Sequence, residues 1–270
     1  RCFDSLDAIV MQVVKQQIGS VCERQTRSCC MHSAGRGGLK RVLRVLAARA
    51  HTYTYVIKSD VYSYYDSIDQ TLLCSMLSKI GIKGAMFALC KGIIGHLLIS
   101  KNGEMTEMRQ GISKGSALSP LFGALYLREL DDAMMRYTKN HGGLYVRYMD
   151  DWIVCCNSKS QLRKRVRTMH RVLGRLKLRV HPDKTYIGKL SKGVDFLGYR
   201  LTNTAKQTLA IASETLKRHH AMVRELYEQH APKEDVRAYV KRWKRWTTAG
   251  LSQVNVLYPQ GVAPRIVLQI

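Results

Sequence analysis

Two short apolar segments with an acidic stretch between them constrain the fold of this chain more than any other feature. Residues 144–148 (LYVRY) and 152–156 (WIVCC) are rich in β-branched and aromatic side chains, and Met149-Asp150-Asp151 lies between them. Segments of this composition form β-strands, and so short a connection joins neighbouring antiparallel strands. Because both segments are apolar, we expect the hairpin to lie within a core sheet, with two carboxylates at its turn.

The rest of the chain is predicted to alternate between helices and short strands. Residues 53–60 and 194–201 are predicted to be strands, 21–38 a loop, and Asn102-Gly103 a hairpin turn. A Ser119-Pro120 cap opens one of the helices, which are predicted at 4–18, 38–48, 69–77, 82–96, 119–137, 158–176 and 213–250, with an interruption at Pro232. This order favours an α+β fold, in which helices pack on one face of an antiparallel sheet and a separate small helical module follows residue 205.

The charge of the chain indicates nucleic acid as its partner. The 270 residues include 44 Lys and Arg against 20 Asp and Glu, a formal net charge of +24. Phosphate polymers bind such chains because each neutralised phosphate releases condensed counterions. An anionic membrane surface and simple solubility are the weaker alternatives. The sequence has no signal peptide and no apolar run of about 18 residues, so we expect a cytoplasmic protein of one large or two small domains that does not enter a membrane.

The cysteines and histidines do not follow a metal-binding pattern. The eight Cys include no C-x-x-C pair, and the nine His include no H-E-x-x-H motif. We therefore expect the cysteines to be reduced thiols in the core. His219 and His220 are expected at the surface of a basic helix.

A third acidic residue, Asp60, ends the predicted strand at 53–60. If this strand pairs with the hairpin, Asp60, Asp150 and Asp151 meet at one edge of a sheet; the alternative is a solvent-exposed acidic turn. Clustered carboxylates repel one another and stay ionised only when cations neutralise them. Mg²⁺ is the expected cation because it binds carboxylates together with substrate phosphates, and a pair of such ions catalyses nucleotidyl transfer. The cluster therefore predicts nucleotidyl transfer on a nucleic acid.

Five segments in a fixed order then carry a family resemblance. They are Lys58–Asp69 (KSDVYSYYDSID), Gln110–Pro120 (QGISKGSALSP), Tyr148–Asp151 (YMDD), His181–Thr185 (HPDKT) and Phe196–Tyr199 (FLGY). Their sequence and order resemble the successive motifs of reverse transcriptases, which are RNA-directed DNA polymerases, and most closely those of the bacterial group II intron-like kind. One such motif alone is weak support, but five in order are specific.

The resemblance implies a catalytic role for the acidic cluster. Asp60 and Asp150 would hold two Mg²⁺ ions, Asp151 would belong to the same cluster, and the backbone carbonyl of Val61 would complete a metal shell. Lys184 would lie near the triphosphate and donate a proton to the leaving pyrophosphate.

The same resemblance implies contacts with the nucleotide and the primer. The ring of Tyr65 would lie under the incoming sugar and collide with a 2′-hydroxyl, so the site would prefer dNTPs. Gln110 and Gly111 would contact the incoming nucleotide and the template, because glycine permits close backbone approach. Phe196, Leu197 and Gly198 would hold the primer end.

At the level of architecture, the resemblance implies the right-hand polymerase fold. Residues 1–52 would form partial fingers, 53–204 the palm with a fingers insertion around 82–110, and 205–270 a helical thumb. The basic helix at 160–177 favours phosphate contact, although its orientation is open. Since the family usually begins further upstream and this chain begins at Arg1 rather than Met, the strands that clamp the triphosphate are either absent or lie before Arg1.

These features predict an RNA-directed DNA polymerase that extends a primer 3′-OH with dNTPs. Its expected partners are an RNA template, a DNA or RNA primer and dNTP, with an associated structured RNA or accessory protein as further partners. The alternative is a basic RNA-binding maturase-like or accessory protein that keeps the polymerase scaffold without catalysis.

Overall fold

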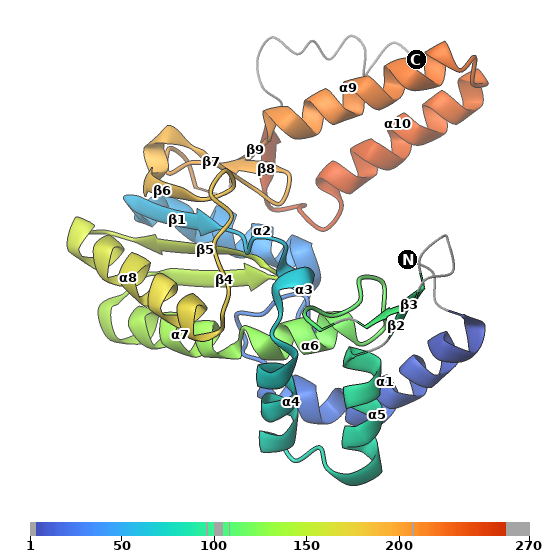
Figure 1. The fold of residues 1–270 in the computed structure, drawn as a ribbon. Helices are drawn as coiled ribbons and strands as arrows, with labels where there is room; N and C mark the ends of the chain where they lie inside the picture. Colours follow the sequence, from blue (N-terminus) through green and yellow to red (C-terminus); the bar gives the residue numbers. More distant parts are fainter. Residues whose placement is uncertain (1–3, 96, 100–104, 108, 207, 258–270) are drawn as a thin grey trace.

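Four antiparallel strands form the central sheet, in the order β4-β5-β1-β6 (Figure 1). The computed structural model describes residues 4–95, 97–99, 105–107, 109–206 and 208–257. The strands are β1 (Tyr55–Ser59), β4 (Leu144–Tyr148), β5 (Asp151–Cys156) and β6 (Tyr186–Lys189). The predicted hairpin at 144–156 is confirmed, and it pairs with the predicted strand before Asp60. The strand β6 was not expected from the sequence.

Both faces of this sheet are buried. Trp152 and Val154 of β5 pack with α7 (Arg128–His141) and α8 (Lys159–Arg175), whereas Ile153 and Cys155 face α2 (Gly38–Arg49) and a second sheet. The expectation that helices cover one face only was therefore wrong. The sequence did contain a signal for burial on both faces, because an apolar run without polar alternation is typical of such a strand.

Helices that flank the sheet build the lower part of the molecule in Figure 1. They are α1 (Ser5–Gln25), α3 (Tyr64–Ser67), α4 (Gln70–Lys79), α5 (Gly84–Ile94) and α6 (Ser119–Tyr126). The strands β2 (Leu97–Ile99) and β3 (Met105–Glu107) form a two-stranded ladder. The Asn102-Gly103 turn predicted between them lies outside the described residues. Helix α1 continues to Gln25, so the loop predicted at 21–38 begins later than expected.

Two predicted elements are each divided in the structure. The helix predicted at 119–137 is α6 followed by α7, with a break at Leu127, and Ser119 lies within the helix rather than capping it. The strand predicted at 194–201 is a hairpin of β7 (Val194–Phe196) and β8 (Tyr199–Leu201). Its turn places Leu197 at φ +51° and Gly198 at φ +87°, the left-handed backbone that a two-residue hairpin requires.

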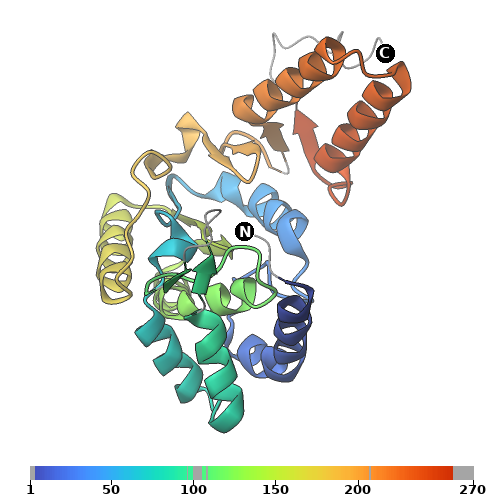
Figure 2. The same cartoon turned by 45° about the vertical axis from the view of Figure 1, so that its right-hand side comes forward.

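The second sheet has the order β10-β9-β8-β7 and carries two long helices. Strand β9 (Thr208–Ile211) pairs with β8 and with β10 (Asn255–Leu257), so the chain beyond residue 205 shares a sheet with the residues before it. Helices α9 (Ser213–Glu228) and α10 (Lys233–Thr248) project from this sheet as a pair, separated at Pro232 as predicted (Figure 2). Strands β9 and β10 were not predicted.

The cysteines agree with the sequence expectation, and one histidine does not. All described cysteines are free, and all of these except Cys74 are buried. His219 is buried between α9 and α10, where its ring stacks on Trp243 with centroids 3.9 Å apart. The prediction of a surface His219 failed because the partner helix, which covers it, could not be placed from the sequence. No helix within the described ranges is both long and apolar enough to cross a bilayer.

Candidate active site

The acidic residues predicted at positions 60, 150 and 151 lie at the same end of the central sheet. Ser59, the last residue of β1, pairs with Trp152 of β5, so Asp60 follows at the end where β5 begins with Asp151. Tyr148 pairs with Asp151 across the hairpin, which leaves Met149 and Asp150 as its connecting residues. We call residues 148–151 the acidic turn. Asp60 is 4% exposed and is therefore held at the sheet rather than in solvent.

The carboxylates act on one another electrostatically. Burial, followed by the charge of Asp60, raises the pKa of Asp150 from 3.8 to about 6. Burial and the charge of Asp60 also raise the pKa of Asp151 to about 6, against the opposing effect of Lys58 and Lys184. Asp150 and Asp151 thus resist ionisation because they are buried and lie near the charge of Asp60, which is the arrangement that a bound cation relieves.

Lys184 belongs to this group. Its Nζ donates a hydrogen bond of 2.6 Å to Oδ2 of Asp60, and this contact raises the pKa of the ammonium group. The loop before β6 is held in place by the backbone: the His181 amide donates to the Asp60 carbonyl over 2.8 Å, and Lys58 Nζ donates to the Lys184 carbonyl over 2.9 Å. The structure therefore places Lys184 against Asp60, and its predicted position near a triphosphate stays a prediction.

The other carboxylate oxygen of Asp60 tests whether the site suits a metal ion. Oδ1 is buried and has no hydrogen-bond partner among the described residues. A buried, unpaired carboxylate oxygen is costly unless a cation reaches it. No three His, Cys, Asp or Glu side chains of the described residues are already arranged as a metal-binding set. The carboxylate oxygens of Asp60 and the acidic turn are nevertheless donors of the type that Mg²⁺ prefers. In the structure, the cation that contacts Asp60 is the ammonium group of Lys184.

The backbone of the acidic turn is fixed from both sides by residues that the sequence analysis missed. Met149 has a positive φ of +57°, which a side-chain-bearing residue rarely adopts. Its amide donates to Nδ1 of His32 over 2.9 Å, and its carbonyl accepts from Nη1 of Arg147 over 2.7 Å. Burial, followed by the charge of Arg147, lowers the pKa of His32 to about 4, so its ring is neutral and Nδ1 accepts a hydrogen bond at neutral pH.

Arg147 is itself anchored in the core. It is completely buried and forms a two-point ion pair with Asp131 of α7, with N–O distances of 2.7 and 2.6 Å. The hydroxyl of Tyr145 donates to the same carboxylate over 2.7 Å. A buried pair of this kind costs desolvation, and its effect here is to hold the turn rigidly. The signal for Arg147 was visible, since it is the one charged residue in the apolar strand LYVRY.

Two tyrosines of α3 lie beside the acidic turn. Burial and the charge of Asp150 raise the pKa of Tyr65 to about 12, and its ring centroid lies 5.3 Å from that of Tyr64. The Tyr64 hydroxyl donates to the Gly123 carbonyl over 2.6 Å. A Cβ atom at Gly123 would lie 3.1 Å from the Tyr64 ring and 3.2 Å from that of Tyr65, so glycine makes room for both rings.

Gly111 approaches the backbone of α3 so closely that no side chain fits. A Cβ atom there would lie 2.8 Å from the Tyr65 carbonyl oxygen and from Cα of Asp66. The Gly111 amide donates to the Ile68 carbonyl over 2.8 Å, which ties this segment to α3. Gln110, the preceding residue, is exposed. The structure therefore brings Gly111 next to Tyr65, and the contact of Gln110 and Gly111 with a nucleotide stays a prediction.

The segment Phe196–Gly198 lies in the second sheet and contacts the helical pair. Phe196 is buried, and the Gly198 carbonyl accepts from the Thr215 hydroxyl over 3.0 Å. A Cβ atom at Gly198 would lie 3.0 Å from the ring of Trp246. This turn is therefore fixed against α9 and α10 rather than against the carboxylates.

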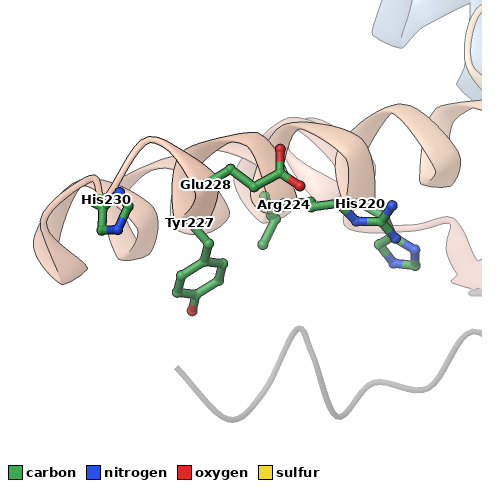
Figure 3. Close-up of a pocket in the computed structure, with 6 residues that line it drawn as sticks. His220, Arg224, Tyr227, Glu228 and His230 are labelled. Atoms are coloured by element: carbon green, nitrogen blue, oxygen red, sulfur yellow. The ribbon is translucent and has the colours of Figure 1, made fainter.

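A separate hollow of about 620 Å³ follows α9 and the turn after it (Figure 3). Its lining residues are His220, Val223, Arg224, Tyr227, Glu228 and His230. None of the residues predicted to contact a nucleotide lines this hollow, so it is not the candidate active site.

Comparison with known proteins decides the family. The profile described as reverse transcriptase (RNA-dependent DNA polymerase) matches residues 5–201, which is most of the chain. The chain belongs to the reverse transcriptase family. The matched range includes the carboxylates, Lys184 and the 196–198 turn, and it ends before α9.

Three proteins that resemble this chain share less than a third of their aligned residues with it. Protein YkfC of Escherichia coli (strain K12) is 28% identical over 180 residues, covering 54% of this chain and 46% of YkfC. Telomerase from Candida tropicalis, truncated from its C-terminal domain, matches with a TM-score of 0.54 at 18% identity over 72% of this chain and 43% of that chain. Telomerase from Candida albicans in complex with a TWJ fragment of telomeric RNA gives a TM-score of 0.54 at 13% identity, over 91% and 47% respectively. The chain spans less than half the length of these relatives, and the likeness to the telomerases shows a shared polymerase palm fold.

Proposed function

We propose that this reverse transcriptase is an RNA-directed DNA polymerase of the group II intron-like kind, which extends a primer 3′-OH with dNTPs on an RNA template. The observation that carries the proposal is that Asp60 and the acidic turn lie at the same end of the central sheet, where burial and the charge of Asp60 raise the pKa of Asp150 and Asp151. The telomerase solved with an RNA fragment supports an RNA partner for a chain of this fold.

In the proposed mechanism, Asp60, Asp150, Asp151 and the Val61 carbonyl hold two Mg²⁺ ions. When bound, the ions would lower the pKa of the primer hydroxyl and stabilise the negative charge of the leaving pyrophosphate. Arg147 and His32 keep the acidic turn in one conformation, so Asp150 does not reorganise during the reaction.

Lys184 acts as the proton donor in this proposal. Its side chain is 55% exposed although its Nζ contacts buried Asp60, so the ammonium group can reach both the carboxylate and solvent-borne phosphate. Transfer of its proton to pyrophosphate lowers the negative charge of the leaving group by one unit. Gln110 and Gly111 position the incoming nucleotide.

Tyr65 selects the sugar in the same proposal. Its ring is half-buried and packed against Tyr64, so it cannot move away from a bulkier sugar without losing that contact. Tyr65→Ala is expected to increase incorporation of rNTPs relative to dNTPs in primer extension. Unchanged sugar preference would instead indicate a template-directed polymerase with another product.

The remaining parts are proposed to bind the template–primer duplex. Residues 1–52 serve as partial fingers, 53–204 as the palm with an insertion around 82–110, and 205–270 as the thumb. The 196–198 turn holds the primer end and is supported by Trp246 of α10. Exposed cations of the helical pair would contact the duplex backbone: Lys217, Arg218, Arg224, Arg237, Lys241, Arg242 and Arg245.

Primer extension with Mg²⁺ on an RNA template tests the proposal. The wild-type chain is expected to extend the primer with dNTPs, and Asp150→Asn is expected not to extend it. Binding of the template–primer is expected to survive this substitution, because phosphate contacts come from other residues. Equal extension by both proteins would remove the catalytic assignment of Asp150. Extension by neither protein, with intact RNA binding, would favour the non-catalytic maturase-like function.

A further inference from the structure

The helix α8 presents a row of arginines that the proposed polymerase mechanism does not use. Arg163, Arg167, Arg171 and Arg175 recur every four residues, and all are exposed. Such spacing places them on one side of the helix, along a line of about 18 Å. We call these residues the arginine row. No acidic residue occurs between positions 158 and 182, so α8 itself offers nothing to neutralise the row.

Most of the arginine row has no charge partner. Arg175 pairs with Glu129 of α7, whereas Arg163, Arg167 and Arg171 form no ion pair within the described part of the chain. Like charges four residues apart each destabilise a helix, so the row has a cost that a bound anion would remove. Arg165 of the same helix does not add to this exposed charge, because its position on α8 faces the core: it is buried, and its Nη2 donates to the Gly142 carbonyl.

Helix α7 adds a second set of polar groups along the same seam. Two hollows of about 430 and 310 Å³ lie between α7 and α8, and Arg171 lines both. Arg136 and Arg175 line the first hollow, while Lys164 and Arg167 line the second. The acidic residues at the first hollow are already paired: Glu129 with Arg175, and Asp132 with Arg27 and Arg128. The seam is therefore a groove with an excess of positive charge.

This groove lies on the opposite side of the central sheet from the helical pair. Helices α7 and α8 pack on the core that contains Trp152 and Val154, whereas α2, the second sheet and Leu216 of α9 share the core on the other face (Figures 1 and 2). A duplex bound by the exposed cations of α9–α10 would therefore lie on the side of the molecule away from the arginine row. The row therefore requires a different occupant.

The chemistry of the groove indicates phosphates rather than lipid or protein. None of the large apolar side chains that are exposed among the described residues belongs to α7 or α8. A helix that inserts into a membrane surface or anchors a protein interface presents such side chains. Guanidinium groups, in contrast, bind phosphates in a two-point geometry.

We propose that the groove between α7 and α8 binds a double-helical RNA segment distinct from the template–primer. In A-form RNA the narrow major groove brings the phosphates of two strands close together. Neighbouring helices lie about 8–10 Å apart, so cations of α8 and of Arg136 on α7 can engage both strands. The inference does not depend on catalysis by this chain.

Fluorescence anisotropy with a capped RNA hairpin of about 16 base pairs, the length that a double-stranded-RNA-binding domain covers, tests the proposal. Binding is measured in the presence of saturating unlabelled template–primer, which occupies the polymerase site. The test variant is the triple substitution Arg163→Gln, Arg167→Gln, Arg171→Gln. The matched control is Lys79→Gln, Lys83→Gln, Lys91→Gln, which removes the same charge from exposed positions of the chain around α4 and α5.

The arginine-row variant is expected to bind the hairpin about 10- to 100-fold more weakly than wild type, and its salt dependence, the slope of log K against log salt, is expected to fall by about 2–3. The control is expected to keep most of the affinity. Circular dichroism checks that both proteins are folded, and single substitutions replace the triple one if it is not.

Three results would overturn the proposal: equal losses in the variant and its control, complete displacement of the hairpin from wild type by template–primer, and equal binding of a DNA hairpin of the same sequence. Row-dependent binding to phosphatidylserine vesicles with row-independent RNA binding would also overturn it. Because the readout is binding, a failure here leaves the primer-extension result unaffected, and the reverse also holds.

Discussion

Replacing Asp150 with Asn separates stability from function at the acidic cluster. Burial, followed by the charge of Asp60, raises the pKa of Asp150 to about 6, so at neutral pH the buried carboxylates repel one another. Asn has nearly the same shape and no charge, so the variant loses the repulsion and keeps the packing. We expect Asp150→Asn to be more stable than wild type and inactive in primer extension.

The expected magnitude follows from the pKa. A rise in the pKa of Asp150 from 3.8 to about 6 corresponds to at most ~3 kcal/mol in the free energy of unfolding, and partial exposure of the cluster reduces this to ~1 kcal/mol. Because the folded-state pKa lies above the unfolded one, the folded chain binds the proton more tightly. Wild type therefore keeps this stability below about pH 4 and loses it as the pH rises to about 6. The gain in the variant is expected above that range and vanishes below it.

Urea unfolding followed by circular dichroism measures the effect across this pH range. Asp183→Asn serves as the matched control, because Asp183 is exposed and forms no ion pair in the described structure. Mg²⁺ is expected to stabilise wild type more than Asp150→Asn, since it relieves the same repulsion. A variant that is less stable than wild type at neutral pH, or a gain that is independent of pH, would refute the clustering of the carboxylates.

Three further predictions concern the support of the site. His32→Ala should lower kcat with little change in KM, because it leaves the Met149 amide of the acidic turn unpaired at a cost of ~1–3 kcal/mol. His32→Asn should partly restore kcat. Identical kinetics of the two variants would argue against the hydrogen bond. Arg147→Met should destabilise the fold by ~3–5 kcal/mol in urea unfolding, because it leaves the buried carboxylate of Asp131 without its ion-pair partner. Adding Asp131→Leu should recover stability but not primer extension. Gly111→Ala should lower the thermal midpoint well beyond Gly115→Ala, since both residues have a positive φ but only Gly111 lacks space for a Cβ; equal shifts would contradict the close approach.

Local patterns in the sequence were sufficient for much of the fold. Strands β4 and β5, the helices α2, α4 and α8, and the break at Pro232 follow from apolar periodicity and capping residues, which act over a few positions. The short strands β6, β9 and β10 were missed because three or four residues carry too little periodicity. The 194–201 segment was misjudged as one strand because its two halves have the same composition, and only the left-handed backbone at Leu197 and Gly198 reverses the chain.

For the site, the sequence by itself determined which residues are the candidates for the chemistry. Asp60 ends a core strand, and Asp150 and Asp151 stand at a hairpin between two core strands, so their chemical type and their place at strand ends were legible from composition and order. The resemblance to the family motifs added Lys184, Tyr65 and Gly111 to these candidates.

Only the tertiary structure decided what holds and surrounds that chemistry. His32 lies 117 positions from the backbone amide it accepts from, and Asp131 lies 16 positions from Arg147, so neither contact leaves a local pattern. The exposed arginine row and the buried Arg165 are all arginines of α8, and they differ only in whether they lie on the side of the helix that faces the core. Short-range periodicity fixes the type of element a segment forms, whereas the pairing of distant segments is fixed by burial and charge compensation, which exist only once the chain has folded.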